Sequence, residues 1–225
     1  AFRDKHQAKS KNGHWINTLY QTPPYDITVG SGALGINMEG KYHRLHTLGH
    51  DPILGWLFGT ANILTDVITL NDFRSFRVDR KPKMRITSTP VSIGMMLQES
   101  YAAVKDDYLN LPAAIFAQAQ HLKSDEYTKT GLPVPLLAAF NENYASALYK
   151  NHYDSLCFAR DMKIVGASFG ISLLIDSIIG IVHGLFRQPE EDVKLFEVRT
   201  RKILLLSNSL ASSSSIIHAC ITSNP

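Results

Sequence analysis

Two nearly uncharged stretches near the end of the chain constrain its fold more than any other feature. Within Ile164–Phe186 the only charged side chain is Asp176, and residues 203–225 carry none. A dense charged connector, Arg187–Lys202, separates the two stretches. The first is long enough for a helix to cross a bilayer, which takes roughly 20 residues. The second, over Ile203–Ile221, is nearly as long, although its serine and asparagine residues lower its hydropathy. We therefore predict an apolar helical hairpin over about residues 164–221.

Either protein or lipid could cover this hairpin. Small residues four apart permit the close helix packing that is common in membranes, and basic residues precede the second stretch as they flank many membrane helices. Against lipid, an aspartate within a lipid-exposed helix is costly, and Asp176 and His183 lie seven apart, on one helix face, where they could pair inside a protein core. We expect a buried core, with membrane association as the alternative. The small residues four apart are Gly166 with Gly170 and Gly180 with Gly184, and the basic residues before the second stretch are Arg199, Arg201 and Lys202.

The composition narrows the class of protein. Of the 225 residues, 44% are hydrophobic and 19% are charged, which allows a core without disulfide bonds and excludes a disordered chain. The net charge of +3 is too small to indicate nucleic-acid binding. The two cysteines, Cys157 and Cys220, exclude a disulfide framework and favour a reducing, cytoplasmic location.

Helix signals dominate the chain. We predict one mainly α-helical domain over residues 1–225, a helical bundle around buried apolar helices with one small β-hairpin. The buried helices are expected near residues 52–70, 164–186 and 203–221, and a polar, basic arm over residues 1–22. The hairpin is expected over residues 73–88, where apolar and charged residues alternate around a turn.

Capping and proline signals set the remaining predicted boundaries. Asp51 followed by Pro52 is a strong helix start, and Thr89 followed by Pro90 repeats that pattern. Gly49 is expected to end a preceding helix. The further helices are therefore predicted over residues 38–48, 90–109, 112–123 and from Pro133 or Pro135 to Tyr153.

Three histidines and a carboxylate lie in one short segment, at His43, His46, His50 and Asp51. Spacings of three and four residues place successive histidines on one helix face, where one ion could reach them. Imidazoles and a carboxylate with an open position form the ligand set of hydrolytic zinc or iron sites. The alternative is structural, because Gly49 and Pro52 break the helix and Asp51 is explained as an N-cap. The sequence favours this structural interpretation.

The His43-Arg44 dipeptide with His46 and His50, placed before an apolar helix, resembles a pattern of some membrane-embedded metal-dependent hydrolases. The glycine and the Thr-His pair that follow the arginine in those proteins are not in place here. The resemblance covers about a tenth of the chain, so no family is assigned from it.

The predicted β-hairpin combines basic and aromatic residues. Cations beside Phe73 and Phe76 could bind phosphates of a nucleic acid or of lipid headgroups. A solvated strand face that protects a sheet edge explains the same pattern. The candidate anion-binding residues are Arg74, Arg77, Lys81, Lys83 and Arg85 in this hairpin, and Arg44 beside the histidines.

Two functions remain open. The first is a non-enzymatic helical protein that packs against a partner chain or a membrane. Its support is the uncharged helices and the absence of P-loop and H-E-x-x-H motifs. The second is a metal-dependent hydrolase that binds zinc through the histidine segment, with Asp176 or His183 as further ligands. We expect a protein partner or self-association, keep membrane association open, and do not expect nucleic-acid binding.

Overall fold

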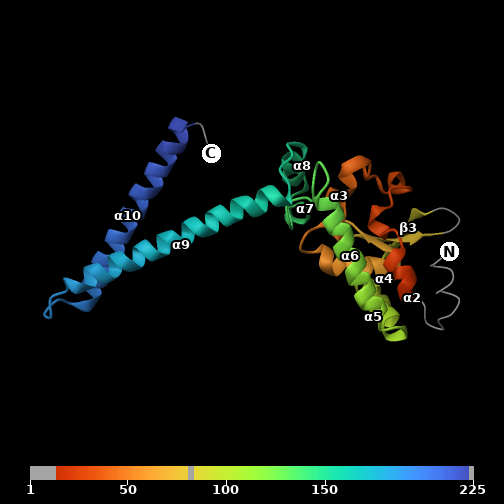
Figure 1. The fold of residues 1–225 in the computed structure, drawn as a ribbon, viewed down its shortest axis with the longest axis horizontal. Coiled ribbons are helices and arrows are strands. Elements are labelled where there is room, and N and C mark those ends of the chain that lie inside the picture. Colours follow the sequence, from red (N-terminus) through yellow and green to blue (C-terminus); the bar gives the residue numbers. More distant parts are fainter. Residues whose placement is uncertain (1–13, 81–83, 223–225) are drawn as a thin grey trace. The chain divides into compact units, whose positions relative to one another are not determined.

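The computed structural model describes residues 14–80 and 84–222, and it is mainly α-helical with a small antiparallel sheet, as predicted (Figure 1). The chain divides into two compact units, residues 1–159 and residues 160–225. Most of the predicted basic arm, residues 1–13, lies outside the described residues. The arm's last part forms helix α2, His14–Tyr20.

The sheet of the first unit has three strands in the order β1-β2-β3: Val67–Thr69, Ser75–Asp79 and Arg85–Val91. Strands β2 and β3 form the predicted hairpin, with Val78 opposite Ile86. Strand β1 was predicted as the end of a helix, which is wrong. Asp66 adopts a left-handed backbone conformation and ends the helix, and the β-branched residues that follow pair with β2.

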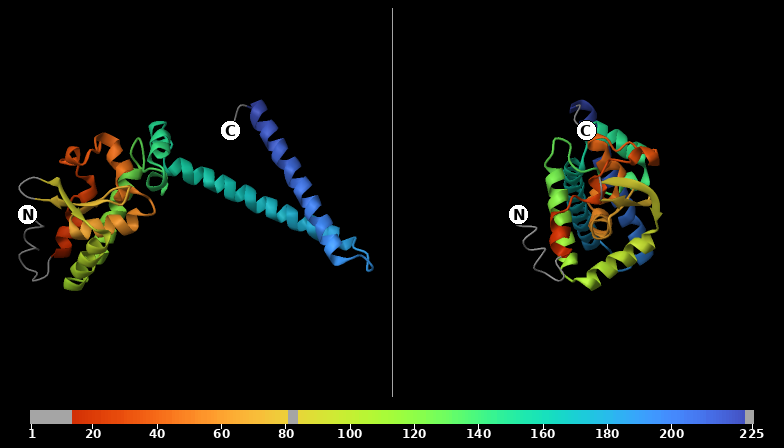
Figure 2. Two further views of the ribbon diagram at one scale, coloured as in Figure 1. Left: turned by 180° about the vertical axis from the view of Figure 1, so that it is seen from behind. Right: turned by 90° about the vertical axis from the view of Figure 1, so that its right-hand side faces the viewer.

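Helices pack against this sheet in the first unit, and Figure 2 shows them from two further sides. Helix α4, Gly55–Thr65, contacts both α5, Ile93–Asp106, and α6, Asn110–Glu126. Most side chains of α4 are buried, as predicted for the apolar helix near residues 52–70. Gly59 permits the close approach of α6, because a Cβ there would lie 2.3 Å from Oε1 of Gln118.

Several predicted helix boundaries are wrong. The helix expected over residues 38–48 is a series of short turns: η3, Gly40–Tyr42; α3, His43–His46; and η4, Leu48–His50. Thr89 and Pro90 belong to β3, and α5 starts only after Ser92, whose hydroxyl accepts a hydrogen bond from the Met95 amide. The helix expected up to Tyr153 is divided at Asn141, the N-cap of the second part. The two parts are α7, Leu137–Phe140, and α8, Glu142–Lys150.

The second unit consists of two long helices, α9 (Ser155–Leu185, which starts in the first unit) and α10 (Val193–Thr222). Nδ2 of Asn208 donates to both carboxylate oxygens of Asp176, at 3.2 and 3.1 Å. His183 stacks on Phe196, and its Nδ1 lies 2.9 Å from Oγ1 of Thr200. The helices diverge away from the connector between them (Figure 1).

The predicted burial of these two helices in a protein core is not found. Phe169, Leu174 and Ile181 on α9 are each more than 60% exposed, and so are Leu205 and Ile216 on α10. Both helices are long and apolar enough to cross a membrane. Their length and composition therefore permit membrane association.

Candidate metal centre

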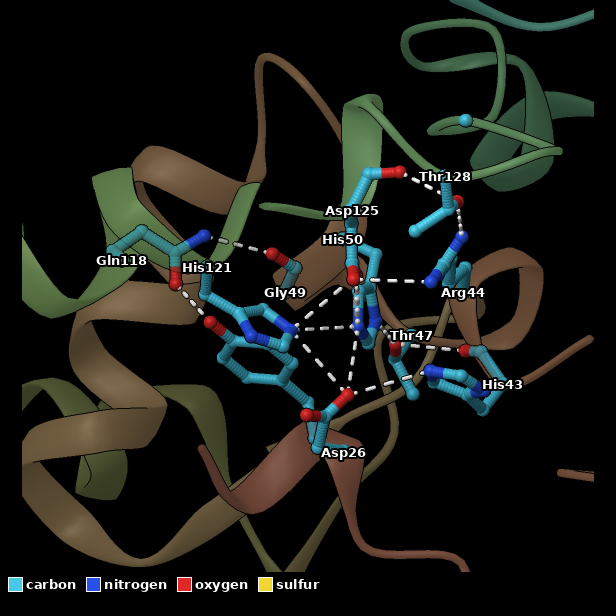
Figure 3. A network of polar contacts seen from close by, with 12 residues as sticks. Asp26, His43, Arg44, Thr47, Gly49, His50, Gln118, His121, Asp125 and Thr128 are labelled. Atoms are coloured by element: carbon cyan, nitrogen blue, oxygen red, sulfur yellow. Dashed lines mark hydrogen bonds and ion pairs between the residues drawn. The ribbon is translucent and has the colours of Figure 1, made fainter. Parts of the chain in front are cut away.

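Five side chains of the first unit meet in one place (Figure 3). Ligand atoms of four of them, Asp26, His43, His50 and Asp125, lie within 4.8 Å of one another. Nε2 of His121 contacts three of these four residues, Asp26, His50 and Asp125. Asp26 ends the short helix η1, Pro24–Asp26; His43 opens α3; and His50 ends η4. His121 and Asp125 lie four residues apart on α6, and therefore on the same helix face. We call Asp26, His43, His50, His121 and Asp125 the donor cluster.

The distances within the donor cluster match the coordination shell of a metal ion. Oδ1 of Asp26 lies 3.3, 3.2 and 3.3 Å from Nε2 of His43, His50 and His121. Oδ2 of Asp125 lies 3.3 and 3.4 Å from Nε2 of His50 and His121, and these two nitrogens are 3.1 Å apart. Ligands about 2.0–2.2 Å from one ion lie about 2.8–3.6 Å apart at octahedral or tetrahedral angles.

Hydrogen bonds outside the cluster fix the tautomers of two histidines. Nδ1 of His43 contacts the carbonyl oxygen of Gly40, to which only a protonated nitrogen can donate. Thr47 donates its hydroxyl proton to the carbonyl of His43, at 2.9 Å, so its oxygen accepts from Nδ1 of His50, at 2.6 Å. Both histidines therefore present an unprotonated Nε2 to the cluster, as metal-ligating histidines do.

Arg44 orients the carboxylate of Asp125. Its Nη2 donates to Oδ1 of Asp125 at 3.0 Å, while Nη1 donates to Oγ1 of Thr128 and to the carbonyl of Thr130, at 2.6 and 2.7 Å. The other carboxylate oxygen, Oδ2, is buried and accepts no hydrogen bond among the described residues. It lies 3.3 Å from the unprotonated nitrogen of His50, and the repulsion between their lone pairs is relieved by a metal ion between them or by a proton on Nε2 of His121, which lies 3.4 Å from the same oxygen.

The electrostatics agree with a site for a cation. Burial lowers the pKa of His50 to about 3, so its ring is neutral at neutral pH. Burial would raise the pKa of Asp26, but its contacts with His121, His43 and His50 hold it well below its usual value. Burial also lowers the pKa of His121, yet its contacts with Asp26 and the charge of Asp125 raise it overall. Burial raises the pKa of Asp125.

The donor cluster is open to solvent on one side. His50 is fully buried, and the side chain of Asp125 is only 11% exposed. Asp26 and His43 are 26% and 17% exposed at their side chains. Solvent therefore reaches the cluster at these two side chains.

A second layer of side chains supports the histidine rings. The ring of Tyr25 packs edge-on against His50 and His121, with centroids 4.9 and 5.4 Å away. Its hydroxyl donates to Oε1 of Gln118, and Nε2 of Gln118 donates to the carbonyl of Gly49 at 2.8 Å. This chain of contacts ties η1, η4 and α6 together directly beneath the cluster.

Of the four metal ligands predicted from the sequence, the structure brings His43 and His50 into the donor cluster. His46 points elsewhere, and its Nδ1 lies 3.1 Å from Oε1 of Glu142. Oδ1 of Asp51 accepts hydrogen bonds from the backbone amides of Ile53 and Leu54, and Oδ2 accepts one from the amide of Leu136, at 2.5–2.9 Å. Asp51 is therefore structural, but the predicted N-cap role is wrong: α4 begins at Gly55 with Leu54 as its N-cap, and Asp51 stabilises the turn before it.

Among the described candidates for anion binding, Arg44 lies on α3, whereas Arg77 and Arg85 lie on β2 and β3 and Arg74 directly precedes β2. Lys81 and Lys83 lie outside the described residues. Each described arginine of the hairpin contacts a carboxylate, which reduces its availability for a phosphate. These pairs are Arg74 with Asp72, Arg77 with Glu99, Arg80 with Asp66, and Arg85 with Asp79.

Sequence reasoning missed Asp26, His121 and Asp125. For His121 and Asp125 a signal existed, since two ligand-type residues four apart on a predicted helix share a face. It was lost because the helix was predicted to end at Lys123. Asp26 carries no such local signal, because only the fold brings η1 to α6.

Comparisons of this chain with protein-family models, with curated proteins and with solved structures give no match. The functional argument therefore rests on the donor cluster itself.

Proposed function

We propose that the first unit is a metal-dependent hydrolase that binds one divalent transition-metal ion, such as zinc, iron or manganese, through the donor cluster. The observation that carries this proposal is the convergence of three Nε2 atoms and two carboxylate oxygens at contacts of 3.1–3.4 Å. Of the two hypotheses drawn from the sequence, this convergence favours the enzymatic one.

The ligand types support hydrolysis as the reaction. Imidazole and carboxylate ligands suit zinc, iron and manganese, and five donors leave one position of an octahedral shell for water or substrate. A metal ion held by these residues would lower the pKa of a bound water and so supply hydroxide near neutral pH. The partial exposure of Asp26 and His43 gives a substrate access to that position.

Arg44 has a different role in this proposal from the one suggested by the sequence. Its guanidinium is engaged by Asp125, Thr128 and Thr130, so it acts as a positioning residue for Asp125. Outer contacts of this kind typically change metal affinity by about 10–100-fold. We therefore do not assign Arg44 to substrate binding.

Metal content tests the first part of the proposal. We expect the purified protein to contain one equivalent of metal by elemental analysis, and the variants His50→Asn and Asp125→Asn to lose it. His46→Asn is the matched control, because His46 lies four residues from His50 but outside the donor cluster. Far-UV circular dichroism verifies that each variant is folded. A folded wild-type protein that binds no added zinc, iron or manganese contradicts the metal site.

A hydrolysis screen tests the second part. The metal-loaded protein is assayed on chromogenic phosphomonoesters, phosphodiesters, carboxylic esters and amides, with Asp125→Asn and His46→Asn in parallel. We expect turnover of at least one class, lost in Asp125→Asn and retained in His46→Asn. Stoichiometric metal without hydrolysis of any class contradicts the enzymatic proposal and leaves the metal site intact.

A further inference from the structure

We infer that a lipid bilayer surrounds α9 and α10 over residues 164–181 and 203–220, with the Asp176–Asn208 contact inside the hydrocarbon layer. In this arrangement the basic residues of the connector lie at one membrane surface. The inference rests on the second unit and does not depend on the metal centre.

The contacts between the two helices define which segments lie at the same depth. Asp176 faces Asn208. His183, seven residues after Asp176, faces Thr200, eight residues before Asn208. Continued in both directions, this register brings residues 164–181 level with residues 203–220. Each segment rises about 27 Å as an α-helix, and the hydrocarbon core of a bilayer is about 30 Å thick.

The apolar surface of α9 extends around its whole circumference. Leu173, Leu174 and Ile175 are consecutive, so they point in three directions about 100° apart, and they are 51%, 62% and 48% exposed. On α10, Leu205 and Leu206 are 69% and 63% exposed. A protein partner covers one face of a helix, whereas lipid covers all faces, and this pattern fits lipid.

Several polar groups within these segments have partners inside the hairpin. The Asp176 carboxylate is engaged by Asn208, a polar partner of the kind that carboxylates within membranes require. Several hydroxyls donate to the carbonyl four residues earlier, a bond that serine and threonine also make in membrane helices. These are Ser177 to Leu173, Ser209 to Leu205 and Ser215 to Ala211. The serines of α10 therefore weigh less against insertion than their number suggests.

Charged residues lie at the two ends of the apolar segments. Within residues 164–181 and 203–220 the only charged side chain is Asp176. Basic side chains at the ends suit a membrane, because lysine and arginine reach the phosphates of lipid headgroups. At the connector end these are Arg187, Lys194 and Lys202, together with Arg199 and Arg201, which also contact Glu191 and Glu197. At the other end they are Lys163 and Arg160, which also contacts Asp161.

Thiol labelling of the full chain tests whether the hairpin crosses the bilayer. Cys157 precedes the apolar part of α9, and both native cysteines are free. One reporter chain keeps Cys157 and carries Cys220→Ser; the other carries Cys157→Ser, Cys220→Ser and Gln188→Cys in the connector. In sealed vesicles, we expect a membrane-impermeant maleimide to modify the two reporters from opposite sides. Modification from the same side, or full release of the protein by alkaline carbonate, overturns the inference.

A second set of variants tests the depth of the Asp176–Asn208 contact. Asn208→Leu makes α10 more apolar, yet we expect it to reduce the membrane-inserted fraction, because Asp176 loses its partner in lipid. The double variant Asp176→Leu, Asn208→Leu restores insertion, and Ser209→Leu is the matched control that leaves the pair intact. Improved insertion of Asn208→Leu alone contradicts the proposed depth. If the protein forms a monodisperse complex with a second copy or a protein partner that is stable without detergent or lipid, then protein and not lipid covers α9 and α10, and the inference is overturned.

Discussion

At the scale of single residues, proton placement explains how the donor cluster could bind a cation. His50 is neutral because burial lowers the pKa of its ring to about 3, whereas the carboxylates around His121 raise the pKa of that ring. Metal binding requires both nitrogens unprotonated. Since His50 already lacks the proton at neutral pH, the proton that competes with the metal resides on His121.

We therefore predict that metal binding releases a proton from His121 and weakens as the pH falls through the raised pKa of that ring. Isothermal titration calorimetry in buffers of different ionisation enthalpy measures the number of protons released. In His121→Asn, which cannot carry this proton, we expect weaker binding with a smaller release. Equal release in His121→Asn and in the wild type would assign the proton to another group.

Thr47 provides a second residue-scale prediction. Its hydroxyl fixes the tautomer of His50, so Thr47→Val removes the contact that keeps the proton on Nδ1. We expect metal affinity to fall about 10–100-fold, measured by competition with a chromogenic chelator. The control is Thr65→Val, since the Thr65 hydroxyl donates to the carbonyl of Ala61 within α4. An equal loss in both variants would indicate general destabilisation.

At the scale of elements, close packing beneath the metal centre depends on Gly49. A Cβ at this position would lie 2.3 Å from Cγ of Tyr25, whose ring supports two histidines. We expect Gly49→Ala to lower the free energy of unfolding by about 1–3 kcal/mol and to weaken metal binding. Urea denaturation measures the first effect, and Gly32→Ala, where a Cβ meets nothing within 4 Å, is the control. Unchanged stability of Gly49→Ala would show that Tyr25 can move aside.

The elements also show how far the sequence predicts this molecule. The β2–β3 hairpin and the long helix α6 follow from local alternation, capping and composition, because their signals lie within each segment. The sequence predicts a possible metal site in the segment with His43 and His50, but the other members of the donor cluster come from η1 and α6. Those contacts link residues about 25 to 80 positions apart, and no local pattern encodes them. Predicting a helix through Asp66 failed because the β1–β2 pairing outweighs helix propensity there.

At the scale of the whole molecule, the two units divide the chemistry between them. All members of the donor cluster precede residue 126, and the two long exposed apolar helices lie almost wholly beyond residue 159. The cytoplasmic location stays a prediction, and the side of the membrane from which Cys157 is modified tests it. A catalytic unit followed by a membrane hairpin would act on substrates at or near a bilayer surface.

This division predicts the behaviour of a shortened chain that ends at residue 159. We expect it to bind metal with the same affinity as the full chain and to lose its partition into liposomes, because the apolar hairpin is removed. Flotation assays and metal titration measure the two properties. Loss of metal binding would mean that the hairpin is needed to fold the first unit. Retained flotation would instead place lipid contact on exposed side chains of α4 and α5, such as Trp56 and Tyr101, and would make the first unit itself a membrane-binding surface.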